Sequence, residues 1–255
     1  MVPPPASTTA NLLYIVEPKG VGAYQYVNAD PVTGERQRNF EREEKSVVVE
    51  NIRGKESSVS LDTAGFQFYL HPAKHSAFVN DEEIRQEYYP ESAKLIKEKT
   101  GASRVELFDH SELLRPIHFK ILKATLSLSA IRRRRPGEAD DSADRRQPVS
   151  QVHVDQTTAS AIARVHRHLP ASDVPELLKR RFQIINLWRP IATPAIDWPL
   201  TLCDYRSVDL ENEVIPVKLI FPDREGETLG VKYNENHKWK YLEGMTPEEC
   251  VLIKW

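Results

Sequence analysis

The chain has 255 residues, 40% of them hydrophobic, which is enough to bury the core of one large domain. Its formal net charge of −2 gives no bulk electrostatic reason to bind nucleic acid or an anionic membrane, and no apolar run is long enough to span a bilayer. The two cysteines, Cys203 and Cys250, are too few for a disulfide framework or a thiolate zinc site, so we expect a reducing, cytoplasmic location.

The first third of the chain contains segments typical of strands. Residues 1–10 lack the basic and apolar regions of a signal peptide, and we expect them to form a flexible tail. Runs of β-branched and aromatic residues predict strands at 12–16, 46–50 and 65–70. The last two flank a turn-rich stretch, as expected of antiparallel neighbours.

A helix is predicted next. Asn80 or Asp81 can cap its start, the pattern runs towards Lys99, and Gly101 follows its end. One face of this helix should pack on a sheet, because apolar residues recur at helical spacing. These residues are Ile84, Tyr88, Leu95 and Ile96.

The middle of the chain is irregular. A strand is predicted at 105–109, followed at 112–130 by an apolar insert with no amphipathic face. Residues 131–148 are highly charged and lack periodicity, so we expect an exposed loop. The arginine run at 132–135 could be a nuclear signal or a nucleic-acid patch, but acidic residues follow it at once and favour a solvated loop.

From residue 149 onwards, short strands alternate with helices. Thr157 or Thr158 can cap a helix through Val165, and Ser172 begins a motif that caps another through Arg181. Strands are predicted at 182–188, 200–204, 217–221, 229–233, 239–242 and 250–254. Several short strands separated by turns indicate a mainly β protein with helices, a sandwich or jelly roll, in a single domain over 11–255.

His153 and Asp155 are the most informative pair of residues. Residues i and i+2 of a strand point to the same face, so the two side chains can offer a nitrogen and an oxygen donor to the same cation. Two histidines and one carboxylate form the facial site of non-haem Fe(II) oxygenases, so this pair would supply two of the three ligands. The alternative is chance, because a chain with eight histidines contains such a triplet fairly often.

Several blocks, in one order, resemble a known family of fungal oxygenases. This family comprises gibberellin desaturases, the aspergillic acid hydroxylase/desaturase and relatives of a cephamycin methoxylation protein. The matching blocks are 61–67, 105–110, 151–157 (Gln-Val-His-Val-Asp-Gln-Thr), 181–191 (Arg-Phe-Gln-Ile-Ile-Asn-Leu-Trp-Arg-Pro-Ile), 197–207, 237–242 and 245–254. Together they are much more specific than the bare His-x-Asp triplet.

The resemblance implies a double-stranded β-helix (jelly roll) whose barrel part, 149–255, carries the metal motif. It implies that His153 and Asp155 bind Fe(II) and that 2-oxoglutarate is the cosubstrate. The expected activity is hydroxylation or desaturation of a small hydrophobic natural product in secondary metabolism.

The chain also departs from the family pattern. Relatives continue past the Ile-Lys block to a second iron-binding His and an arginine-rich strand, whereas this sequence ends at Trp255. We therefore expect a C-terminally incomplete jelly roll, with the third ligand beyond Trp255, and our hypothesis for the insert at 112–130 is a translated intron. The alternative function is that of a truncated, inactive relative, either an unstable fragment or a jelly-roll binding protein.

Asn186 and Arg189 lie in an otherwise apolar predicted strand. Asn186 shares a face with Trp188, and Arg189 takes the other. Both are candidates for binding cosubstrate or substrate at the barrel mouth. Alternatively, Asn186 satisfies neighbouring backbone groups and Arg189 pairs with an aspartate, Asp197 or Asp204.

Other candidate residues have simpler interpretations. His237 could be the missing iron ligand, but its block is structural in the family. His166 and His168 lie at a helix end, where a cation suits the helix dipole. Cys203 is most simply a small core residue.

Overall fold

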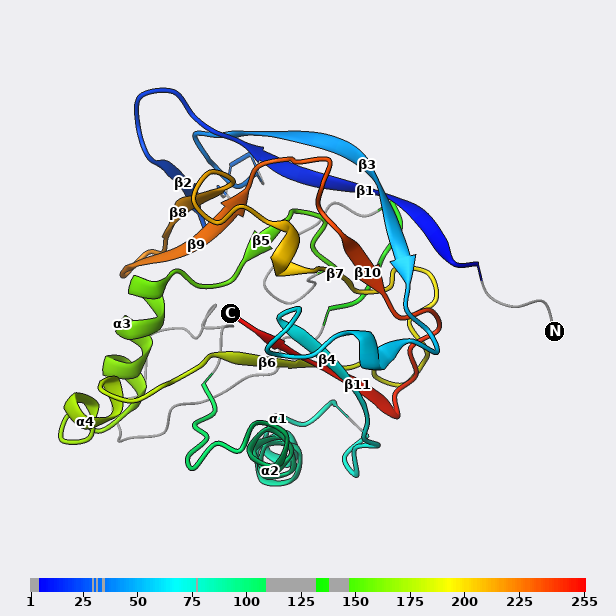
Figure 1. The fold of residues 1–255 in the computed structure, drawn as a ribbon. Helices are drawn as coiled ribbons and strands as arrows, with labels where there is room; N and C mark the ends of the chain where they lie inside the picture. Colours follow the sequence, from blue (N-terminus) through cyan, green and yellow to red (C-terminus); the bar gives the residue numbers. More distant parts are fainter. Residues whose placement is uncertain are drawn as a thin grey trace.

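The computed structural model describes residues 5–28, 30, 32–33, 35–76, 78–108, 132–137 and 147–255. These residues form three sheets around a common interior, and the helices lie on the outside (Figure 1). In this part of the chain, no helix has the length and apolar character that crossing a membrane would require.

The first sheet is formed by widely separated parts of the sequence. Its strands, in order, are β1 (Ser7–Val16), β3 (Glu41–Asn51), β10 (Trp239–Tyr241) and β7 (Thr201–Cys203). Because β1 begins at Ser7, the predicted flexible tail is wrong for residues 7–10. Residues 7–9 are exposed, so they lack the apolar alternation that signals a strand, and backbone pairing with β3 orders them instead.

The second sheet consists of β4 (Phe66–Leu70), β11 (Glu249–Lys254) and β6 (Ile185–Trp188), with β11 in the middle. The predicted pairing of the strands at 46–50 and 65–70 is wrong, because β3 pairs with β1 and β10 whereas β4 pairs with β11. Successive residues of β11 face opposite sides of the sheet. Val251 packs in the interior with Ile52 and Phe66, and Leu252 packs on the outer side.

A helical layer covers the outer side of this second sheet (Figure 1). It consists of α1 (Asp81–Glu83), a π-helical segment η2 (Ile84–Tyr88) and α2 (Tyr89–Thr100). All four residues of the predicted apolar face are buried. The π-helical segment has a local cause, because Pro90 has no N–H to donate to the carbonyl of Gln86. Gly101, with a φ of 69°, ends α2 as predicted.

The third sheet carries the His-x-Asp motif. Its strands, in order, are β2 (Ala23–Tyr26), β8 (Val214–Ile220), β9 (Glu225–Val231) and β5 (His153–Val154). Two helices follow β5 in the sequence, α3 (Thr158–His168) and α4 (Val174–Leu178). They lie outside the sheets, at the left of the view in Figure 1. Two short 3-10 turns, η1 (Glu56–Ser58) and η3 (Tyr205–Ser207), complete the helical elements of the described residues.

The sequence predicted most of these elements, and the differences are local. Strands β6 and β7 and helix α4 are shorter than predicted, and residues 105–108 are not a strand, since no neighbouring strand pairs with them. The insert at 112–130 lies outside the described residues. Residues 132–137 have no helix or strand and are mostly exposed, which confirms a loop for that part of 131–148.

Candidate metal centre

Strand β5 is short, and its two neighbours fix its position. The backbone of Leu13 in β1 bonds the chain on both sides of Gln151, accepting from Val152 N–H at 2.8 Å and donating to the Ser150 carbonyl at 3.1 Å. His153 and Val154 then pair with Gly230 and Leu229 of β9. Both contacts come from sequence-distant strands, so the motif has a defined place although its own strand has only two residues.

The chain leaves β5 through a capped helix start. Thr157 Oγ1 accepts the backbone N–H of Ser160 at 3.1 Å, which confirms the predicted cap of α3. The same hydroxyl donates to Glu227 of β9 at 2.5 Å. Asp155 therefore lies in a short connection that is anchored at both ends.

His153 and Asp155 converge, as predicted, although Asp155 lies just after β5 and not on the strand itself. Nε2 of His153 lies 3.1 Å from Oδ1 of Asp155, and the two side chains are 36% and 28% exposed. Nδ1 of His153 lies 2.7 Å from the carbonyl oxygen of Gln151. A carbonyl can only accept, so Nδ1 carries the proton and Nε2 faces the carboxylate.

The other oxygen of Asp155 is held from the opposite sheet. Nδ2 of Asn186, on β6, donates to Oδ2 of Asp155 at 2.9 Å. A metal-binding histidine usually donates its second ring N–H to a carbonyl or carboxylate, and a metal-binding carboxylate usually accepts a further hydrogen bond. Gln151 and Asn186 supply this outer layer of support.

The protonation of His153 depends on its carboxylate neighbour. Burial works to lower the pKa of His153, whereas the hydrogen bond to Asp155 and the negative charge of Asp155 raise it. The net direction is upward. The two groups therefore form a polarised pair, in which the carboxylate attracts either a proton or a metal cation.

The donor set fits Fe(II). Imidazole nitrogen and carboxylate oxygen are the donors of the facial iron site, and each donor here has its supporting hydrogen bond. Within the ranges that the structure describes, no group of three or more His, Cys, Asp or Glu side chains is arranged so that it could hold a metal ion. His153 and Asp155 thus offer two donors of the kinds that a facial site uses.

A large cavity adjoins the pair. It has a volume of about 2970 Å³, and its lining includes His153, Asp155 and Asn186. This exceeds the few hundred to about 1,000 Å³ of an ordinary small-molecule site. The cavity therefore has room for a substrate beside a metal centre.

Arg189 lies on the other side of the sheet from Asn186. Its Nη1 donates to the carbonyl of His71 at 2.9 Å, and its guanidinium lies 5.6 Å from the ring centre of Tyr88 in the helical layer. It also lines the cavity, but it does not join His153 and Asp155. Neither aspartate suggested as its partner pairs with it: Asp197 bonds Arg134, and Asp204 bonds Arg206.

His237 lies in a buried network of its own. Its side chain is 1% exposed, and its Nε2 lies 2.8 Å from Oε2 of Glu213. Nε1 of Trp239 donates to the hydroxyl of Tyr14 at 2.9 Å beside it. The structural interpretation of His237 is therefore confirmed. The Tyr14 hydroxyl contacts both His237 and Trp239, and the sequence pattern did not predict this contact.

The other candidate residues, His166, His168 and Cys203, lie outside the candidate metal centre. His166 is exposed on the last turn of α3, and the ring of His168 stacks on Phe108 at 5.0 Å. Cys203 packs beside the buried cluster around Tyr14 and Trp239. Burial raises the pKa of the Cys203 thiol to about 11, which makes it a poor nucleophile.

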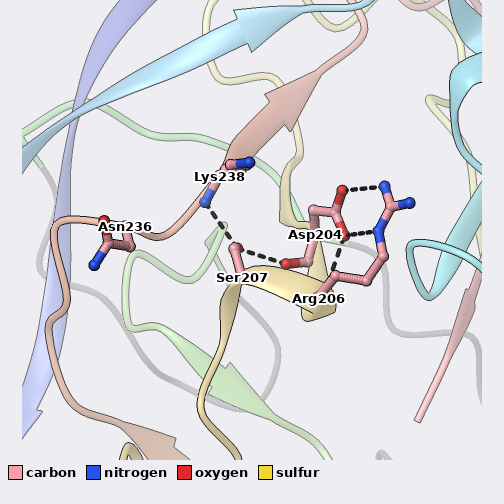
Figure 2. A pocket seen from close by; sticks show the side chains of 5 residues that line it. All are labelled: Asp204, Arg206, Ser207, Asn236 and Lys238. Carbon is pink, nitrogen blue, oxygen red and sulfur yellow. Dashed lines mark hydrogen bonds and ion pairs between the residues drawn. The ribbon is translucent and has the colours of Figure 1, made fainter.

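A smaller hollow of about 640 Å³ lies at the turn after β7 (Figure 2). It is lined by Asp204, Arg206, Ser207, Asn236 and Lys238. Nε of Arg206 donates to Asp204 at 2.8 Å and holds the pKa of that carboxyl below its usual range. The Ser207 hydroxyl donates to the Asp204 carbonyl at 2.6 Å and accepts the Lys238 N–H at 2.9 Å. These bonds stabilise the turn, and the hollow offers no imidazole for a metal.

Comparison with known proteins identifies the family. The family model described as "Oxidoreductase/YMDC permease-like domain" matches residues 12–255. The chain is 34% identical over 225 residues to a hydroxylase/desaturase of Hormonema carpetanum, covering 82% of this chain and 70% of that protein. The chain belongs to the hydroxylase/desaturase family.

Two further relatives agree with this assignment. An Fe(II)/2-oxoglutarate-dependent dioxygenase of Aspergillus novofumigatus is 27% identical over 252 residues, covering 96% of this chain and 82% of that protein. A solved structure of an iron and alpha-ketoglutarate-dependent endoperoxidase, a variant with one tryptophan replaced by phenylalanine, superimposes with a TM-score of 0.75 and 25% identity. It covers 100% of this chain and 85% of the other. The expected jelly-roll fold and oxidoreductase class are thus confirmed, and these two relatives depend on iron and 2-oxoglutarate (alpha-ketoglutarate).

Proposed function

We propose that this chain hydroxylates or desaturates a small hydrophobic natural product of secondary metabolism at an Fe(II) centre held by His153 and Asp155. The observation that carries the proposal is the 3.1 Å approach of His153 Nε2 to Asp155 Oδ1 at the wall of a large cavity. In a member of this oxygenase family, such a pair is suited to bind the iron.

The chain's own residues have distinct parts in this proposal. His153 and Asp155 bind the metal, the Gln151 carbonyl keeps the proton of His153 on Nδ1, and Asn186 fixes the rotation of the Asp155 carboxylate. When bound, iron and 2-oxoglutarate supply the activation of O2. The cavity positions the substrate, and positioning decides between hydroxylation and desaturation.

The first test measures metal binding. Purified protein is titrated with Fe(II) without oxygen and followed by calorimetry. The wild type is expected to bind Fe(II), and His153→Ala and Asp155→Ala are expected to lose this binding. His166→Ala removes an exposed imidazole on α3 and serves as the matched control. Equal Fe(II) affinity of His153→Ala and the wild type would rule out the proposed ligand.

The second test measures the cosubstrate. With Fe(II), 2-oxoglutarate and O2, the wild type is expected to release succinate slowly even without its substrate. A chain that binds no Fe(II) and releases no succinate would instead be the inactive relative. Succinate release that persists in Asp155→Ala would contradict the proposed role of this carboxylate.

A further inference from the structure

Asp155, a proposed iron ligand, lies just beyond the last pair of a strand ladder. Strand β5 runs beside β9 and ends at Val154, which pairs with Leu229, and Asp155 is the next residue (Figure 1). A site residue in a connection is held less precisely than one inside a strand, unless other contacts fix the chain around it. The position of Asp155 therefore depends on what holds the backbone before and after it.

Thr228 of β9 holds the backbone before Asp155. Its hydroxyl donates to the carbonyl oxygen of Val154 at 2.5 Å. This carbonyl belongs to the peptide group that joins Val154 to Asp155, and a peptide group is planar, so its plane includes the nitrogen and Cα of Asp155. A bond that fixes the carbonyl oxygen therefore also limits the movement of the Cα that carries the Asp155 side chain.

Glu227, the neighbouring residue on β9, holds the backbone after Asp155. Its Oε1 accepts the hydroxyl proton of Thr157 at 2.5 Å, and the oxygen of the same hydroxyl accepts the Ser160 N–H at 3.1 Å. Two bonds at once fix the rotamer of Thr157, which is only 8% exposed. The carboxylate also lies near the N-terminal end of the 11-residue helix α3, where a negative charge is favourable. Glu227 therefore holds the start of α3 and, through it, the chain two residues after Asp155.

These two contacts complement the bond from Asn186. Successive residues of a strand point to opposite faces, so Thr228 and Glu227 reach the connection from the two faces of β9. Asn186 holds the Asp155 carboxylate itself, from the second sheet. The main chain is thus held by one sheet and the side chain by another, and this arrangement is suited to pre-organise a metal ligand.

We propose that Thr228 and Glu227 are positioning residues of the iron site, which direct the Asp155 carboxylate by holding the chain on either side of it. The inference rests on the proposed function and adds to it the residues that hold one of its ligands in place. Neither of the two side chains binds the metal in this proposal. Their loss should therefore lower the Fe(II) affinity without removing a donor.

The first experiment removes the Thr228 hydroxyl. Thr228→Val keeps the shape of the side chain, and we expect it to bind Fe(II) about tenfold more weakly than the wild type in an oxygen-free calorimetric titration. Thr228→Ser keeps the hydroxyl and should restore most of the lost affinity. Thr201→Val makes the same change on β7 of the first sheet and serves as the matched control. Wild-type affinity of Thr228→Val, or equal losses in the Val and Ser variants, overturns the proposal for Thr228.

The second experiment removes the Glu227 carboxylate. We expect Glu227→Ala to lower the Fe(II) affinity about tenfold, because Thr157 then loses its acceptor and the chain after Asp155 can shift. Glu227→Gln retains a carbonyl oxygen that can accept the Thr157 hydroxyl, so its affinity should fall less. Glu225→Ala, at an exposed position of the same strand, is the control. Unchanged affinity of Glu227→Ala overturns the proposal for Glu227.

Co(II) separates positioning from a loss of stability. Bound Co(II) has visible absorption bands that depend on the geometry of its ligands. With enough Co(II) to fill the site, we expect these bands to change in Thr228→Val and Glu227→Ala and to stay the same in the two controls. Unchanged bands, together with a fall in the denaturation midpoint that accounts for the weaker binding, would mean that the two residues only stabilise the fold, which overturns the proposal.

Failure of the proposed function would be distinguishable from failure of this inference. If the wild type binds no Fe(II), the proposed function is wrong, and the positioning is then measured in the metal-free protein by nuclear magnetic resonance. The side-chain amide resonances of Asn186 report its hydrogen bond to Asp155. They are expected to shift in Thr228→Val and Glu227→Ala but not in Thr201→Val, and unchanged resonances would contradict the positioning role as well.

Discussion

Asn186 donates a 2.9 Å hydrogen bond to Asp155 across the interior, from one sheet to the strand end of another. Asn186 lies on β6, and its neighbour β11 contains three residues that are 0% exposed, Cys250, Val251 and Leu252. The carboxylate therefore takes its orientation from a part of the fold that is difficult to displace. This contact links the rigidity of the second sheet to the geometry of the candidate metal centre.

Replacing Asn186 should lower the Fe(II) affinity and leave the stability of the fold almost unchanged. We expect Asn186→Ala to lower the Fe(II) affinity roughly 10–100-fold, because the Asp155 carboxylate can then rotate away from His153. Calorimetric titration with Fe(II) measures this, and the melting temperature should change little. Asn236→Ala removes an exposed amide and serves as control. Unchanged Fe(II) affinity of Asn186→Ala would show that Asn186 does not orient the carboxylate.

Gly230 of β9 lies so close to Ile15 of β1 that the site has no room for a side chain. It pairs with His153, and a Cβ at this position would lie 2.8 Å from Cδ1 and 2.9 Å from Cγ2 of the buried Ile15. Such overpacking costs about 1–3 kcal/mol, so Gly230→Ala should lower the free energy of unfolding by that amount. A denaturant titration checks this. A Cβ at Gly22 meets nothing within 4 Å, so Gly22→Ala should be nearly neutral, and equal effects of the two variants would refute the crowding argument.

Because of the contact between Glu213 and His237, the free energy of unfolding should depend on pH in the acidic range. Burial works to raise the pKa of Glu213, but hydrogen bonds from His237, Asp209 N–H and Asn234 lower it more, so it lies below its ordinary value of 4.5. A lowered pKa means that the folded protein favours the carboxylate. The stabilisation is therefore full above about pH 4.5 and is lost as the pH falls through the folded-state pKa.

Removing this carboxylate should flatten the acid limb of the stability curve. At neutral pH, Glu213→Gln is expected to cost on the order of 1–3 kcal/mol, because His237 loses a charge-assisted bond at a buried site. Urea titrations from pH 7 to pH 3 compare this variant with Glu211→Gln, an exposed control. If the wild type and Glu213→Gln lose stability in parallel below pH 5, another group is responsible.

Leu252 joins the second sheet to the helical layer. It is 0% exposed and packs with Leu61 and Ile96 on the outer face of β11. Leu252→Ala is expected to cost about 2–5 kcal/mol, because the cavity left between sheet and helix cannot fully close. Leu70→Ala, on the neighbouring strand but 76% exposed, should change the free energy of unfolding by less than about 0.5 kcal/mol. Chemical denaturation compares the two, and similar losses would argue against a specific role for this contact.

Local patterns predicted those features that depend on residues close in the chain. The i, i+2 spacing of His153 and Asp155 predicted their shared direction, and the apolar spacing from Ile84 to Ile96 predicted the buried face of the helical layer. The helix cap at Thr157 followed from one hydroxyl before a helix. Each of these predictions was confirmed because it depends only on the backbone geometry of a few neighbouring residues.

Other features needed contacts between distant segments. Ser7–Ala10 carry no apolar alternation, and they form a strand because β3 offers them backbone partners. Arg134 lies in the exposed loop that the sequence predicted, but the sequence did not indicate that it would pair with Asp197 and lie over Trp198. No spacing rule could place these residues together, since long-range packing brings them into contact.

By itself, the sequence determined the motif, its helix cap and the family resemblance, because these reside in short, contiguous runs of residues. Only the tertiary structure decided that Asn186 reaches Asp155, that Arg189 faces the helical layer, and that His237 is buried with Glu213. The packing of the three sheets determines which side chains meet in the interior. These side chains come from distant parts of the sequence, so no local periodicity relates them.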